Sequence, residues 1–128
     1  MPLTPPDLSR PYASSADKDA DWQLLLRRTE SLQELTRLSG VPEAQWPAGE
    51  AARLRAVPSI SGETAGQRLA RWRNVFASEI ADLERAVLAA SSQGGSATVA
   101  DIDLRSAVYL AARLLATLYD VAIDQVSP

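Results

Sequence analysis

The segment from Leu104 to Tyr119 constrains the fold most, because Arg105 and Arg113 are its only charged residues. Its leucines and alanines favour a helix, and a helix that is apolar nearly all round must be buried nearly all round. Two further long helices would offer too few neighbours for that burial. We therefore expect a fourth, short helix that packs on this segment, or a dimer with this segment at its interface, or both.

Three long helices are expected, over residues 16–39, over residues 64–91 and from residue 98 onwards. The first ends before Gly40 and Pro42, a stop signal. The second opens with Thr64 and Gln67, which fit a capping box. The third opens at Thr98. Apolar residues recur along the second helix at steps of three and four, a strong amphipathic pattern: Leu69, Trp72, Phe76, Ile80, Leu83 and Val87.

The remaining segments predict an arm and a connector. Residues 1–15 contain four prolines and predict a flexible, Pro-rich N-terminal arm, which leaves residues 16–128 as a single helical domain. In the connector, residues 41–62, the sequence after Pro47 can form about two helical turns. No run of alternating residues suggests a strand. The expected fold is an all-α helical bundle of three long helices and a short connector helix, completed by dimerisation.

The composition excludes several kinds of chemistry. The chain has no Cys and no His, so disulfides, thiolate catalysis, His bases and Cys/His metal sites are excluded. Any metal must take oxygen ligands, as Mg²⁺, Mn²⁺ and Ca²⁺ do. A net charge of −3 argues against DNA, RNA and anionic membrane as partners. Without a signal peptide or a membrane span in the sequence, we expect a cytoplasmic protein.

Two carboxylates stand one turn apart on the second expected helix. On a helical wheel Glu79 and Asp82 lie about 60° and 120° from Phe76, at the edge of the apolar stripe. Such a pair can hold one divalent cation, and Asp103 on the next helix can lie opposite it if the two helices are antiparallel. On this helix alone, the two carboxylates fit solvated surface charges paired with Arg71 or Arg85 better, and Asp103 is what favours a metal site.

The segment R-W-R-N-V-F-A-S-E-I-A-D-L-E-R-A-V resembles the acidic helix of the MazG-like all-α NTP pyrophosphohydrolases. That family carries an ExxE motif on one helix and an ExxD motif on the next. In this chain Glu79 and Asp82 match the first pair and Asp103 matches the next acid. Ser106, which carries no charge, stands where the final aspartate belongs. The resemblance covers roughly residues 64–124.

The resemblance implies hydrolysis of a nucleoside triphosphate to a monophosphate and pyrophosphate. Glu79, Asp82 and Asp103 would hold Mg²⁺ or Mn²⁺, with Glu79 and Asp82 as the catalytic residues. An arginine would steady the pyrophosphate, and Arg85, Arg105 and Arg113 are the candidates.

The residues alone are also consistent with two other functions. The apolar third helix and the Pro-rich arm favour a non-catalytic helical dimerisation or adaptor module. A bundle that binds a small ligand through Trp22, Trp46 and Trp72 is also possible, although Trp72 is in phase with the apolar stripe and favours core packing. Both the hydrolase and the adaptor allow the expected homodimer, so the oligomeric state does not distinguish them.

Overall fold

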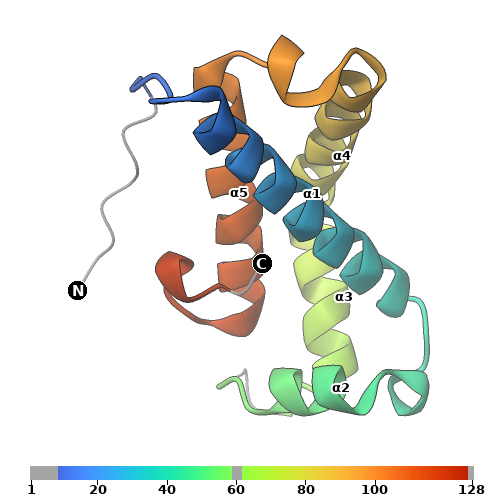
Figure 1. Ribbon diagram of the computed structural model, residues 1–128. Coiled ribbons are helices and arrows are strands. Elements are labelled where there is room, and N and C mark those ends of the chain that lie inside the picture. The colour runs from blue at the N-terminus through green and yellow to red at the C-terminus, as the bar shows by residue number, and fades with distance from the viewer. Residues whose placement is uncertain (1–8, 59–61, 127–128) are drawn as a thin grey trace.

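The computed structural model describes residues 9–58 and 62–126, and all regular structure within these ranges is helical (Figure 1). The all-α prediction is therefore confirmed. The prolines at positions 2, 5 and 6 lie outside the described residues. The α-helices are α1 (Ser15–Leu38), α2 (Ala48–Arg55), α3 (Ala65–Val75), α4 (Ala77–Ser92) and α5 (Asp101–Tyr119). Short 3₁₀ helices lie in the connecting segments: η1 (Glu43–Gln45), η2 (Gly95–Thr98) and η3 (Ile123–Gln125).

Local signals in the sequence place several of the helix ends. Ser14 caps α1, accepting a 3.1 Å hydrogen bond at Oγ from the backbone N–H of Asp17. The capping box of α3 forms in both directions: Gln67 N–H donates to Thr64 Oγ1 at 3.1 Å, and Thr64 N–H donates to Gln67 Oε1 at 2.9 Å. The predicted opening of the last helix at Thr98 is wrong, because Thr98 belongs to η2 and α5 begins at Asp101.

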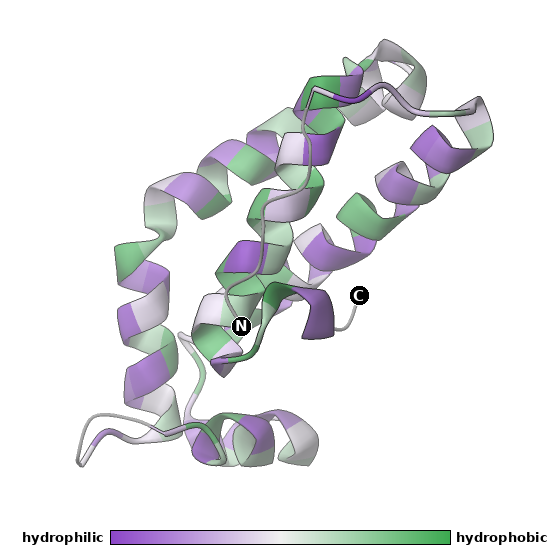
Figure 2. Ribbon diagram, turned by 90° about the vertical axis from the view of Figure 1, so that its left-hand side faces the viewer, coloured by the Kyte–Doolittle hydropathy of each residue, from purple (hydrophilic) through white to green (hydrophobic). Residues whose placement is uncertain are grey.

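The second predicted helix, residues 64–91, is not one helix. It breaks at Phe76, whose backbone angles of φ −108° and ψ 18° separate α3 from α4. Figure 2 shows the resulting bend. The two parts pack on different neighbours, α3 against α2 and α5, and α4 against α1 and η2. The steps of three and four continue through Phe76, so the pattern hides the break.

Neighbouring helices of the same chain bury α5. It packs most extensively along α1, and α2, α3 and η3 also contact it. The Trp72 indole N–H donates to the backbone oxygen of Leu114 at 2.9 Å, which fixes α3 against α5. The expected short connector helix that packs on this segment is therefore present as α2. Because α2 helps to cover α5, burial of this helix does not require a dimer.

The other tryptophans are core residues, as the connector and stripe patterns indicate. Trp46 is 7% exposed, and its indole N–H is shared between the backbone oxygens of Leu38 at 3.0 Å and Val41 at 2.9 Å. Trp22 and Trp72 are 6% and 3% exposed. All three therefore stabilise the packing of the helices. Within the described ranges, none of the helices combines the length and hydropathy needed to cross a bilayer.

Candidate functional site

The three predicted metal ligands are all exposed, two of them on α4 and one on α5. Glu79 is exposed in the first turn of α4, and Asp103 is exposed in the first turn of α5. Asp82 is exposed on α4 and pairs with Arg85, one turn along the same helix. In the part of the chain that the structure describes, no three acidic side chains gather closely enough to hold a metal ion. The expected convergence of these carboxylates is therefore not observed.

The three carboxylates do not converge because α4 does not pack along α5. The convergence requires α4 to run antiparallel along α5, but α4 packs mainly against α1 and η2, while α1 occupies the core face of α5 (Figure 1). The acidic residues then have ordinary local roles. Carboxylates in the first turn of a helix, such as Glu79 and Asp103, complement the positive end of the helix dipole. An exposed pair one turn apart, such as Asp82 with Arg85, adds a few tenths of a kcal/mol at most.

The three predicted phosphate-binding arginines are also separate. Arg85 pairs with Asp82, and Arg113 is exposed on the second half of α5. Arg105 holds the N-terminal arm: its Nε donates to the backbone oxygen of Arg10 at 2.8 Å, and its guanidinium lies 4.0 Å from the ring centre of Tyr12. Residues 10–12 of the predicted arm therefore contact α5.

Tyr12 and Asp101 complete this anchor. The Tyr12 backbone N–H donates to Asp101 Oδ2 at 3.0 Å, and Lys18 Nζ lies 3.0 Å from Asp101 Oδ1. These contacts hold the pKa of Asp101 below its ordinary value, the bond from Tyr12 first and Lys18 second. The Tyr12 hydroxyl donates to Asp21 at 2.8 Å, and its pKa is raised, chiefly by burial and then by this bond. The cluster links the arm, α1 and α5.

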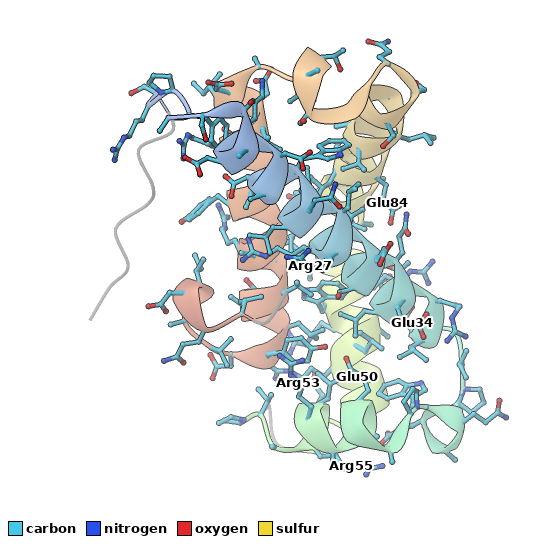
Figure 3. The ribbon with its side chains drawn as sticks, in the orientation of Figure 1. Arg27, Glu34, Glu50, Arg53, Arg55 and Glu84 are labelled. Carbon is cyan, nitrogen blue, oxygen red and sulfur yellow. The ribbon has the colours of Figure 1, made fainter. Side chains whose placement is uncertain are left out.

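A hollow of about 430 Å³ lies where α1, α2 and the end of α5 meet (Figure 3). The Tyr119 hydroxyl donates to Glu50, and the Arg53 guanidinium lies 3.6 Å from the centre of the Tyr119 ring. Burial raises the pKa of the Tyr119 hydroxyl, and the bond to Glu50 raises it further. Figure 3 shows Arg27 and Glu34 on α1 above this group. The bond between Tyr119 and Glu50 joins α2 to α5.

A second hollow, of about 230 Å³, lies at the start of α3. A helix N-terminus attracts anions, but here a carboxylate of the chain already occupies that position. Glu43 accepts a 3.4 Å hydrogen bond from the Gly66 N–H and a 2.9 Å bond from Arg55 Nε. Arg68, which is 8% exposed, donates to the backbone oxygen of Leu118 at 3.0 Å. The Glu43 carboxylate thus links Arg55 on α2 to the start of α3, and Arg68 links α3 to α5.

The outer face of α4 differs from these polar sites because its apolar side chains are not covered. Nine of the sixteen residues of α4 are apolar, yet only Ile80 and Leu83 are buried. Leu88 is 72% exposed, and Val75, at the end of α3, is 62% exposed. Leu88 was not among the predicted site residues. The signal that could have revealed it is its phase: it lies about 80° from Ile80 on the wheel, outside the buried stripe.

Comparisons with protein-family models, with curated proteins and with solved structures give no match to this chain.

Proposed function

We propose that this protein is a non-catalytic helical interaction module, which docks on a partner through the outer face of α4. The observation that carries this proposal is the poor burial of an apolar helix. Two of the sixteen residues of α4 are buried, whereas α5 buries eight of nineteen. The chain thus has an apolar helix whose outer side has no neighbour among the described residues.

The energetics favour a partner on this face. Single exposed apolar residues are normal on protein surfaces, but apolar residues that share a face commonly mark an interaction site. On α4 Leu88 shares one side of the helix with Ala81 and Ala77, two and three turns before it, and Val87 is half-buried at the edge of that side. Covering one leucine side chain contributes about 1.5–3 kcal/mol. A partner helix laid along α4 would gain this contribution without a change in the fold.

The hydrolase prediction makes a different demand on the same helix. It requires Glu79, Asp82 and Asp103 to act together on one Mg²⁺ or Mn²⁺ ion, and it gives Leu88 no role. The interaction module needs no contact among the three carboxylates. Substitution of Leu88 therefore separates the two functions.

The experiment is photo-crosslinking in the cells that produce the protein. The photoreactive residue p-benzoylphenylalanine is placed at Leu88 in one variant and at Gln23, an exposed position on α1, in a control. We expect discrete covalent adducts at position 88 and none at position 23. Absence of adducts at position 88, or equal adducts at both positions, would overturn the proposal.

A further inference from the structure

We propose that the groove between α3 and α5 docks an acidic peptide segment of another protein, which inserts one large apolar side chain into the groove. An apolar hollow whose two charged lining residues are both arginines points to this partner. No residue of α4 lines the hollow, so this surface is separate from the docking face of α4.

The hollow has a volume of about 210 Å³ and an apolar lining. Trp72 and Leu118, which are 3% and 0% exposed, close it on the core side, and Val75, which is 62% exposed, lies at its outer edge. An apolar cavity of about 150 Å³ holds a benzene molecule. This hollow therefore has room for the side chain of a leucine or a phenylalanine, and such a side chain would cover Val75.

Two hydrogen bonds show how the helices on either side of the hollow lie. The Trp72 indole N–H donates to the backbone oxygen of Leu114 at 2.9 Å, and Arg68 Nε donates to that of Leu118 at 3.0 Å. As the residue number falls by four on α3, from 72 to 68, it rises by four on α5, from 114 to 118. The two helices therefore run antiparallel, side by side, and form the two walls of a groove.

Each wall carries an accessible arginine. On α3, Arg71 donates two hydrogen bonds to Glu63, at 2.7 and 3.0 Å, and its side chain remains 49% exposed. Arg68 lies 3.9 Å from the same carboxylate, so two arginines share one negative charge. On α5, Arg113 is exposed one turn before Thr117, which lines the hollow, and none of the described carboxylates pairs with Arg113. The groove therefore has a net positive charge.

This local charge is opposite in sign to the net charge of the chain, which is −3. A segment with acidic residues on both sides of an apolar residue would meet a guanidinium on each wall while its apolar side chain fills the hollow. Complementary charges of this kind favour the correct partner and speed its association. A nucleic acid would meet the arginines but leave the apolar hollow empty. The groove thus fits an acidic peptide better.

Peptide selection tests this chemistry without a guess at the sequence of the partner. Random dodecapeptides displayed on phage are selected on the purified chain, and those that also bind Thr117→Trp are removed. Thr117 is exposed, so a tryptophan there covers the hollow without entering the core. We expect the remaining peptides to carry a large apolar residue with acidic residues on both sides. If no peptides remain, or if they show no excess of acidic residues, the proposal is overturned.

Fluorescence anisotropy of a labelled peptide from this selection measures the contribution of the charges. Arg113→Glu should weaken binding by about ten-fold, because it replaces an attraction with a repulsion. Arg73→Glu is the matched control, since it makes the same charge change on the opposite side of α3, and it should weaken binding by about two-fold at most. Equal effects of the two substitutions would contradict the proposed position of the peptide.

Salt gives an independent measure of the same contacts. Raising the NaCl concentration from about 0.1 M to about 1 M shortens the Debye length from about 10 Å to about 3 Å. The affinity of the selected peptide should therefore fall several-fold. An affinity that does not change with salt would contradict recognition through the arginines.

A second copy of this chain is the alternative occupant, because Ile102 is 50% exposed between Asp101 and Asp103. Sedimentation of the purified chain without peptide tests this alternative. If another protein is the partner, the wild-type chain and Thr117→Trp should sediment with the same mass. A wild-type dimer that Thr117→Trp disperses would overturn the proposal.

Discussion

Leu83 and Leu88 are the same residue type on the same helix, yet the structure predicts opposite effects for their replacement by alanine. Leu83 is 3% exposed, and its replacement leaves a cavity in the core, which should lower the free energy of unfolding by about 2–5 kcal/mol. Leu88 is 72% exposed, and both leucine and alanine favour helix. Leu88→Ala should therefore change the stability of the monomer by less than about 0.5 kcal/mol.

The cost of Leu88→Ala should appear in the docking of a partner on α4 instead. The complex loses most of one covered leucine side chain, about 1.5 kcal/mol. A loss of about 1.5 kcal/mol corresponds to roughly a ten-fold weaker affinity.

Photo-crosslinking from position 92 at the end of α4, in chains with and without Leu88→Ala, measures the docking, and urea unfolding of the purified chain measures the stability. Leu83→Ala, which destabilises the fold, is the comparison variant. Two results would refute the reasoning: an unchanged crosslinking yield for Leu88→Ala, or a loss of stability comparable to that of Leu83→Ala.

Three further outcomes are expected. Thr64→Ala removes half of the capping box of α3 and should lower the free energy of unfolding by about 1 kcal/mol, measured by thermal or urea unfolding; an unchanged stability would contradict the cap. Glu79→Ala should leave Mn²⁺ binding in calorimetry unchanged, with or without a nucleoside triphosphate; micromolar binding that this variant abolishes would favour the hydrolase. Asp101→Asn removes a carboxylate whose pKa is lowered in the folded chain by Tyr12 and Lys18. The stability that Asp101 contributes is therefore present above its ordinary pKa of 3.8 and is lost as the pH falls through the lowered pKa of the folded chain. In unfolding experiments the wild-type chain should be more stable than Asp101→Asn near neutral pH, and this difference should vanish in acid. A difference in stability that does not depend on pH would contradict this.

Elements whose signals are local could be predicted from the sequence. Gly40 and Pro42 end α1, Thr64 and Gln67 begin α3, and the sequence after Pro47 forms α2. In each case the residues that determine the boundary lie within a few positions of it. Period and capping chemistry are sufficient for this purpose.

The bend at Phe76 could not be predicted, because the helical spacing of apolar residues continues across it and no proline or glycine marks it. The bend has a large effect on the candidate site, since it turns α4 towards α1 and η2. The spacing between Asp82 and Asp103 permits antiparallel helices but does not determine which helix packs on which. That choice depends on tertiary contacts.

The role of Arg105 was likewise not visible in the sequence. Its partners, Arg10 and Tyr12, are more than ninety residues away along the chain. Leu88 is a different case, since its phase on the wheel already set it apart from the buried stripe. An apolar residue that departs from the dominant phase of a helix is a signal for a second face.

The most direct test of the docking role of α4 is hydrogen exchange of its backbone amides, compared with those of α5, in the purified chain and in the complex captured at position 88. Because α4 buries few side chains, its amides in the purified chain should exchange faster than those of α5. In the complex, where the α4 face is covered, α4 should gain more protection than α5. Exchange of α4 that is as slow as that of α5 in the purified chain, and unchanged in the complex, would contradict the account.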